Sequence, residues 1–470
     1  MLLIALRTAG TVILARLLTP RDFGVVSMVM VVVVFAGMFK DAGLSTATVQ
    51  QEHISHEQIS TLFWVNTLFS GVLTLLLIAA SPLVARFYNE PELGSVTSVL
   101  SLSFVISGLT IQHQALLTRH MRFGALAAVQ VLSQVASLGV TTVLALMGWR
   151  YWALVGGTLA IALAGTLATF YYCPWIPGPM RRGTGARRML TFGGHLTAFN
   201  FVNYFSRNLD NILIGRYIGA EALGLYSRAY QLFMMPITQV RSPLNQVAIP
   251  LLSGLNRDPT RYARYYERLL GVLATLTVPL TLYCVLEAEF LIRVLLGTQW
   301  LGAVPVFRVL AIAGMTQPLA GTTGLVQVTC GFSAQYFEWG VVTAVASCLS
   351  FVVGLPFGIE GVAMAYAVAS YLLLVPSLLY CFRNTPVSVA LFTRAVAVPL
   401  AVGGLAALTT LLVKHAWPGD TLVMHGCYAG TFWLVYFGFT WGRRSVRDTA
   451  GLLLSRRSSQ PSRAPGEGAP

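Results

Sequence analysis

LARLLTPRDFGVVSM (Leu14–Met28) and IGRYIGAEALGLYSR (Ile214–Arg228) are two copies of one short pattern within a largely apolar chain. Three positions are identical in the two copies, namely Arg16 and Arg216, Gly24 and Gly224, and Ser27 and Ser227. Internal repeats of this kind build the two halves of many membrane transporters around a central site. Since both copies occupy equivalent places between hydrophobic segments, the repeat predicts two similar helical lobes.

The composition indicates a membrane protein. Only 10% of the 470 residues are charged and 56% are hydrophobic. A soluble protein of this length carries charge on roughly a quarter of its residues, and the apolar stretches here are too many and too long for a signal peptide or a single anchor. We therefore expect an all-α polytopic fold with about 14 transmembrane helices. It would comprise two six-helix lobes, related by a pseudo-two-fold axis along the membrane normal, and two extra C-terminal helices.

The expected spans are close to the roughly 20 residues that are needed to cross the hydrocarbon core. They lie at residues 1–18, 22–39, 62–85, 94–114, 123–147, 152–172, 191–216, 222–250, 269–291, 303–327, 333–356, 359–382, 389–413 and 422–441. The first span is at the lower limit of length, and since Met1 opens directly onto apolar sequence, its helix could begin upstream. The repeat copies close spans one and seven, and this even separation gives both the same orientation in the membrane.

The same pattern sets the expected domain organisation. It consists of an N-terminal lobe at 1–172, a basic cytoplasmic linker at 173–190, a C-terminal lobe at 191–382, two additional helices at 383–441 and a disordered cytoplasmic tail at 442–470. The linker is rich in Pro, Gly and Arg, which is typical of an exposed connector. The tail is polar and Pro-rich, which predicts disorder.

The net charge of +14 reports topology rather than a nucleic-acid partner. About nineteen of the 31 Lys and Arg residues fall in alternate connectors that would share one side of the membrane. The opposite set holds about seven, namely Arg16, Arg21, Arg86, Arg150, Arg216, Arg293 and Lys414. This asymmetry is the positive-inside pattern, and it predicts that both termini are cytoplasmic.

The sequence contains no recognisable motif for covalent catalysis. Its six cysteines are scattered singly, without metal-ligand or redox spacing, and are interpreted as small buried hydrophobes. It contains no Gly-rich phosphate loop, paired-carboxylate motif or nucleophile elbow, and the expected outer connectors are too short to hold a catalytic domain. We expect no enzyme activity, no cofactor and no metal site.

The seventh span carries a polar stripe. In GGHLTAFNFVNYFSRNLDNILIGRYIG, polar residues recur at intervals of three and four, namely Asn200, Asn203, Arg207, Asp210 and Asn211. An arginine at the bilayer centre costs roughly 2.5–3.5 kcal/mol, so this face should meet protein or water. In one interpretation Arg207 pairs with Asp210 while the asparagines hold neighbouring helices. In the other, Arg207 attracts an anionic substrate into a hydrated cavity, and Asp210 balances its charge when the cavity is empty.

Other intramembrane charges are further candidates. Arg7 lies in the matching half of span one without a nearby carboxylate, which suggests a functional site, although its side chain could instead extend to lipid headgroups. Arg228 and Arg308 are weaker candidates for substrate contact. Glu338, about a turn inside span eleven, is a candidate ligand for a coupling cation.

Two further acidic residues lie at the end of a span and are not expected to bind a ligand. Glu287 and Glu289 lie at the outer end of span nine beside Arg293. We expect them to form a solvated rim.

Several phrases resemble the polysaccharide-transporter branch (Wzx-type flippases) of the multidrug/oligosaccharidyl-lipid/polysaccharide (MOP) exporter superfamily. They are LARLLTPRDFG (14–24), FKDAGLSTATVQ (39–50), FWVN (63–66), HQALLTRHMRF (113–123), GWRYWALV (148–155), SRNLDNILIGRYIGAEALGLYSRAYQL (206–232) and LLGTQW (295–300). They span the first ten expected helices in order, whereas the last four resemble the family mainly in number and hydropathy. The first helix is shorter than is usual in this family.

The resemblance implies a flippase that moves an undecaprenyl-diphosphate-linked oligosaccharide from the cytoplasmic to the periplasmic leaflet of the bacterial inner membrane. The route would be alternating access, and the product O-antigen, capsule or exopolysaccharide. Membrane lipids, a glycan polymerase of the same pathway and a coupling cation would be partners. The candidate residues suit such a cargo, because arginines (Arg7, Arg207, Arg228) bind diphosphate and polar side chains (Asn200, Asn203, Tyr204, Asn211) bind sugar.

Three alternatives remain open. A multidrug/cation antiporter of the same superfamily should have an acidic and aromatic site, whereas the intramembrane charge here favours arginine. A lipid II flippase would present the same diphosphate chemistry. A membrane glycosyltransferase or polymerase needs the large outer loop that the sequence lacks.

Overall fold

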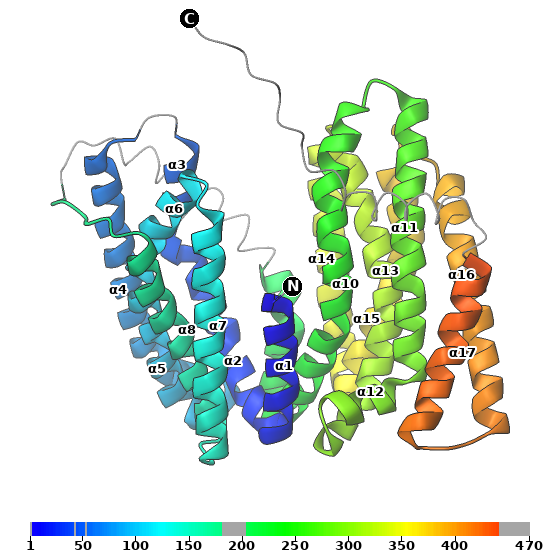
Figure 1. The fold of residues 1–470 in the computed structure, drawn as a ribbon, viewed down its shortest axis with the longest axis horizontal. Helices are drawn as coiled ribbons and strands as arrows, with labels where there is room; N and C mark the ends of the chain where they lie inside the picture. Colours follow the sequence, from blue (N-terminus) through cyan, green and yellow to red (C-terminus); the bar gives the residue numbers. More distant parts are fainter. Residues whose placement is uncertain (1, 42–43, 52–53, 181–203, 441–470) are drawn as a thin grey trace, which may run out of the picture. The chain divides into compact units, whose positions relative to one another are not determined.

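The structure is a computed structural model that describes residues 2–41, 44–51, 54–180 and 204–440 (Figure 1). Within these ranges all regular structure is helical and there is no strand. Nine of the described helices are long and apolar enough to cross a membrane, and a bent pair (Glu92–Gly108 and Ile111–Arg119, 42° apart) makes a possible tenth. The prediction of an all-α polytopic membrane protein is confirmed.

The helices follow the expected spans closely. Those of the first part are α1 (Leu2–Leu17), α2 (Pro20–Asp41), α3 (Leu44–Gln50), α4 (His56–Tyr88), α5 (Glu92–Gly108), α6 (Ile111–Arg119), α7 (Phe123–Leu146), α8 (Tyr151–Tyr172) and a helix at 204–217. The others are α10 (Ala220–Gly254), α11 (Pro259–Leu286), α12 (Ala288–Leu295), η1 (Thr298–Ala303), α13 (Val304–Thr329), α14 (Ser333–Gly354), η2 (Leu355–Phe357), α15 (Gly358–Cys381), α16 (Val389–Ala416) and α17 (Leu422–Thr440). Every expected span matches a helix or a helix pair, and the seventh is described from residue 204 onward.

The chain divides into two compact units. The first comprises Met1–Tyr230, Leu291–Val306 and Ala344–Tyr366. The second comprises Gln231–Phe290, Phe307–Thr343 and the chain from Ala367 onward. The lobe boundaries expected from the sequence remain predictions.

In the first unit, α4 buries polar side chains against its neighbours and exposes large apolar ones. α4 buries Ser70 and Thr74 while Leu68 and Leu75 are 66% and 68% exposed. The Thr74 hydroxyl donates to the carbonyl of Ser101 on α5 (3.0 Å), and α4 and α5 lie side by side in Figure 1. Lipid tails are as apolar as leucine, so helices in a membrane associate through small residues and hydrogen bonds. The distribution on α4 is that of a lipid-facing helix.

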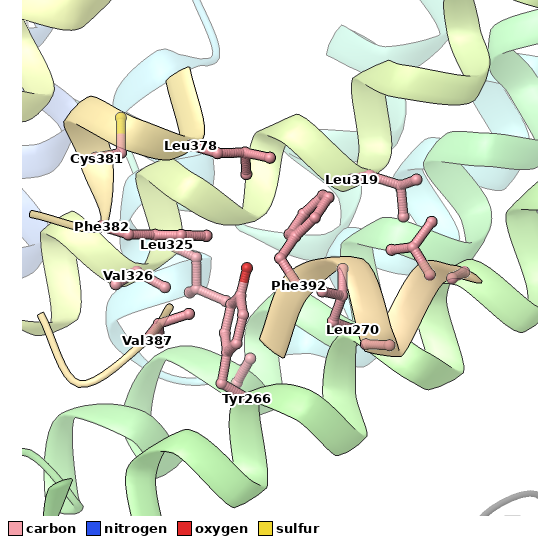
Figure 2. Packing of buried hydrophobic residues seen from close by; sticks show 14 of the residues in the cluster. Tyr266, Leu270, Leu319, Leu325, Val326, Leu378, Cys381, Phe382, Val387 and Phe392 are labelled. Atoms are coloured by element: carbon pink, nitrogen blue, oxygen red, sulfur yellow. The ribbon is translucent and has the colours of Figure 1, made fainter. Parts of the chain in front are cut away.

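The second unit has an apolar core, part of which Figure 2 shows. α11 contributes Tyr266 and Leu270, α13 contributes Leu319 and α16 contributes Phe392. The Tyr266 hydroxyl is 2.7 Å from the hydroxyl of Thr322 on α13, which satisfies the polar end of a buried ring. This core fixes α11 and α16, and α17 packs on both.

Candidate functional site

Both copies of the repeat form the same local structure. Each begins in the last turn of one helix, makes a short turn and continues into the next helix, at α1–α2 and at 204–217–α10. In the first copy, Asp22 accepts hydrogen bonds from the backbone N–H (3.0 Å) and hydroxyl (2.7 Å) of Thr19 at the start of α2. In the second, Gly219 makes the turn with a φ of +117°, a conformation that favours glycine.

The two copies touch each other, reciprocally, within the first unit. A Cβ added to Gly24 would lie 1.6 Å from the carbonyl oxygen of Ala220, and one added to Gly224 would lie 1.8 Å from that of Pro20. The hydroxyls of Ser27 and Ser227 are 3.4 Å apart. Since each copy contacts the same positions of the other, a local two-fold axis runs between them. We call these six residues the repeat contact; here α2 and α10 meet backbone to backbone, without room for a side chain.

The paired arginines anchor the two copies to neighbouring helix ends. Arg16 donates to the carbonyl of Val294 in the last turn of α12 (2.6 Å). Arg216 donates to the side-chain oxygen of Asn89, which caps α4, at 2.6 Å when that amide is oriented to accept. A guanidinium at a helix C-terminus satisfies carbonyl groups and complements the helix dipole. These arginines therefore stabilise the ends of α12 and α4.

An aromatic cluster covers the first copy. The guanidinium carbon of Arg228 lies 3.9 Å from the ring centroid of Phe23, and the rings of Phe23 and Trp300 are 5.4 Å apart. The indole of Trp300, in η1, donates to the carbonyl of Ala15 (2.8 Å). Half-buried Arg228 thus lies on a ring next to the repeat contact, a cation–π arrangement that leaves less of its charge for a substrate.

The polar residues of the seventh span differ in their burial and in their hydrogen-bond partners. Tyr204 is buried and its hydroxyl donates to the carbonyl of Val31 on α2. Asp210 is also buried, and it accepts hydrogen bonds from the hydroxyl of Tyr226 (3.0 Å) and from the backbone N–H of Asn211 (2.8 Å). These bonds, not an ion pair with Arg207, hold the Asp210 carboxylate among the described residues.

The remaining stripe residues differ in exposure. Arg207 is exposed and Asn211 is half-buried. Asn200 and Asn203 lie outside the described residues.

The other candidates are not among the residues of the repeat contact. Arg7 is exposed on α1, and Arg308 is exposed on α13. Glu338 is exposed on α14 and accepts a hydrogen bond from the hydroxyl of Tyr380 on α15 (2.6 Å). Glu338 and Arg308 belong to the second unit, whereas Arg7 belongs to the first.

The expected solvated rim at Glu287 is wrong. Its side chain is fully buried, with Lys414 Nζ at 2.6 Å and His425 Nδ1 at 2.7 Å. These partners come from α16 and α17, more than 120 positions away, so the nearest basic residue along the sequence, Arg293, was misleading. The sequence did contain one indication of this cluster, because Lys414 ends one apolar span and His425 begins the next.

A hollow of about 590 Å³ lies on α17 in the second unit, lined by Ala429, Gly430, Trp433, Leu434, Phe437 and Gly438. Its lining offers no charged side chain, so it does not suit a diphosphate group.

Comparison with known proteins gives the family. A family model described as polysaccharide biosynthesis protein matches residues 13–305. Teichuronic acid biosynthesis protein TuaB of Bacillus subtilis (strain 168) is 30% identical over 308 residues, which cover 65% of this chain and 64% of TuaB. Succinoglycan biosynthesis transport protein ExoT of Rhizobium meliloti (strain 1021) is 28% identical over 340 residues, 71% of this chain and 68% of ExoT. The matched region thus spans somewhat less than two thirds of TuaB's own length.

The fold is similar to that of lipid II flippase MurJ in an inward closed conformation. The TM-score is 0.75 at 14% identity, over 93% of this chain and 96% of the MurJ chain. At this identity the likeness concerns the fold alone. The family-model match, over more than half of the chain, shows that the chain belongs to the polysaccharide biosynthesis protein family.

Proposed function

We propose that this protein is a flippase that moves an undecaprenyl-diphosphate-linked oligosaccharide from the cytoplasmic to the periplasmic leaflet of the bacterial inner membrane, for O-antigen, capsule or exopolysaccharide synthesis. Both termini would be cytoplasmic, as the distribution of basic residues predicts. Family relatives that are named for teichuronic acid and succinoglycan biosynthesis support a glycan cargo.

The repeat contact is the observation that carries the transport mechanism. It joins two equivalent helix pairs about a local two-fold axis through backbone approaches that no side chain could enter. Two helix pairs that meet in this way could separate by tilting about the shared axis, which is the kind of motion that alternating access needs. Arg16, Arg21 and Arg216 beside the contact belong to the sparser set of basic residues, so the contact would close the periplasmic side.

The exposed arginines suit the cargo's diphosphate. A guanidinium offers forked donors to phosphate oxygens, and Arg207 on the helix 204–217 and Arg7 on α1 are both exposed. Asn211 would bind sugar hydroxyls, and so would Asn200 and Asn203. Buried Asp210, held by Tyr226, would keep the local charge low, and Glu338 would serve an ion-coupling step. Half-buried Arg228 and buried Tyr204 would shape the path more than they contact the cargo.

The test is complementation of a strain that lacks this gene, with membrane levels checked by immunoblot. Arg207→Ala should abolish surface glycan while lipid-linked oligosaccharide accumulates on the cytoplasmic side, because assembly continues without translocation. Arg207→Lys should restore part of the display, since the charge is kept without the fork. Arg261→Ala, an exposed change at the start of α11, is the matched control and should display fully. Full display with Arg207→Ala would refute the role of this arginine in binding the diphosphate.

A missing lipid-linked intermediate would refute transport as the function. In a strain without this protein, a flippase defect leaves the intermediate assembled and stranded, whereas a glycosyltransferase or polymerase defect changes its sugar composition or chain length. The intermediate should therefore be present at full composition in the deletion strain.

A further inference from the structure

A carboxylate is buried among charges where α11, α16 and α17 meet, in the second unit. Glu287 caps the C-terminus of α11, and its side chain is 0% exposed. One oxygen lies 2.6 Å from Lys414 Nζ and the other 2.7 Å from His425 Nδ1. Lys414 also donates to the carbonyl of Leu286 (3.2 Å). A buried charge persists when it is paired and hydrogen-bonded; here Lys414 supplies the opposite charge and His425 the hydrogen bond.

The imidazole of His425 lies between two carboxylates. Its other nitrogen, Nε2, is 3.2 Å from Oδ1 of Asp420, in the segment between α16 and α17. A neutral imidazole has one N–H and one lone pair, so only the protonated ring can donate to both Glu287 and Asp420. The ring of Phe290 stacks on this imidazole (4.0 Å, 16°) and that of Tyr428 meets it edge-on (5.6 Å, 88°). These two rings hold the imidazole in the plane that faces both acids.

The three side chains form a path from solvent to the interior. Asp420 is 68% exposed, His425 is 9% exposed and Glu287 is 0% exposed. Water therefore reaches the cluster from the Asp420 end. A proton arriving at Asp420 can pass to Nε2 of His425, whose opposite nitrogen already faces the buried acid.

The charges balance only when His425 is protonated. Lys414 and the imidazolium then oppose the carboxylates of Glu287 and Asp420. Other titratable side chains near the cluster are Tyr283 and Cys284 on α11, Glu289 on α12, the exposed His415 on α16 and Tyr428, whose hydroxyl donates to the carbonyl of Trp417 (2.6 Å). Arg293 follows on α12. Among the described residues, Asp420 and Glu287 are the acids that contact His425.

We propose that Glu287, His425 and Asp420 form a proton-binding site, at which protonation of His425 ties the segment between α16 and α17 to the end of α11. When the proton leaves, the remaining N–H stays on Nδ1, because the bond to Glu287 is the shorter and more deeply buried one. The Nε2 lone pair then faces the Asp420 carboxylate and repels it. The contact between Asp420 and His425 is then lost, and with it one of the bonds that hold the start of α17.

The location of the site suggests its use. The distribution of basic residues places this end of the helices on the periplasmic side, which is the more acidic side of an energised inner membrane. A proton site there would make the proton the coupling cation of the flippase. This use rests on the proposed function, whereas the site itself does not.

The experiment is hydrogen exchange, read by mass spectrometry, on the purified full chain in nanodiscs at about pH 5.5 and about pH 8, which bracket histidine titration. After correction for the intrinsic pH dependence of exchange, the amides of residues 421–426 should be roughly tenfold more protected at the lower pH, the effect of one charge-assisted hydrogen bond. His425→Gln should be weakly protected at both pH values. Asp420→Asn should remain protected at both, because an amide can donate to the neutral ring or accept from the charged one.

The matched control is His415→Gln, an exposed histidine in the last turn of the same helix as Lys414, which should keep the wild-type pH dependence. Equal protection of the wild type at both pH values would overturn the proposal. So would pH dependence that persists in His425→Gln or disappears in His415→Gln. Asp420→Asn keeps the test informative if His425→Gln does not fold, since Asp420 is exposed. Because no cargo is present, failure here is distinguishable from failure of the flippase assignment.

Discussion

Gly24→Ala should open the repeat contact. The added methyl carbon would begin 1.6 Å from the carbonyl oxygen of Ala220, whereas carbon and oxygen atoms come no closer than roughly 3.2 Å, so α2 and α10 must move apart by roughly 1.5 Å. Overpacking at a rigid backbone contact costs about 1–3 kcal/mol. A change of this size shifts the ratio of closed to open molecules by about 5- to 150-fold. Gly224→Ala should act alike, since its methyl group would begin 1.8 Å from the carbonyl oxygen of Pro20.

Disulfide formation between Ser27→Cys and Ser227→Cys measures this shift, in a background with the six native cysteines replaced. The hydroxyls of the native serines are 3.4 Å apart, so the cysteine pair should cross-link rapidly under mild oxidation. Adding Gly24→Ala should slow cross-linking at least about fivefold. Gly139→Ala on α7 is the matched control, because a Cβ there meets nothing within 4 Å. An unchanged rate with Gly24→Ala, or no cross-link in the parent pair, would refute the closed contact.

Two further changes test the buried polar groups, with thermal unfolding in detergent as the measurement. Glu287→Ala should lower the free energy of unfolding by about 3–5 kcal/mol, because it leaves Lys414 beside an empty buried site. Glu289→Ala, at an exposed position, should change the free energy of unfolding by less than about 0.5 kcal/mol. Equal effects of the two substitutions would contradict the burial of Glu287. Tyr226→Phe should cost about 1–3 kcal/mol, because the buried Asp210 loses a hydrogen bond, and adding Asp210→Asn should recover part of that loss. A Tyr226→Phe protein as stable as the wild type would show that water replaces the hydroxyl.

The helices could be placed from sequence because hydropathy and span length constrain them directly. The expected spans at 123–147 and 389–413 coincide with α7 and α16 to within a few residues, and the turns at Pro20 and Gly219 fall inside the two repeat copies. The repeat also predicted equivalent positions for Gly24 and Gly224. The repeat did not predict that the two glycines contact each other's helices. Two segments with identical residues can lie at any distance from the axis that relates them.

Side-chain partners were harder to predict. Periodicity put Arg207 and Asp210 on one face of the seventh span, but the surroundings differ along that face, so Asp210 is buried against Tyr226 while Arg207 is exposed. The site role of the asparagines and arginines stays a prediction. Glu287 shows the limit most clearly, since its true partners are distant in sequence and only the packing of α16 and α17 brings them close.

The reciprocity of the repeat contact has a mechanical consequence. The approaches of Gly24 to Ala220 and of Gly224 to Pro20 share one rotation axis, so a tilt that lengthens one lengthens the other by a similar amount. Neither of these two contacts can open while the other stays closed. The repeat contact should therefore open in a single concerted step. A state in which only one of the two glycine contacts is open should not be populated.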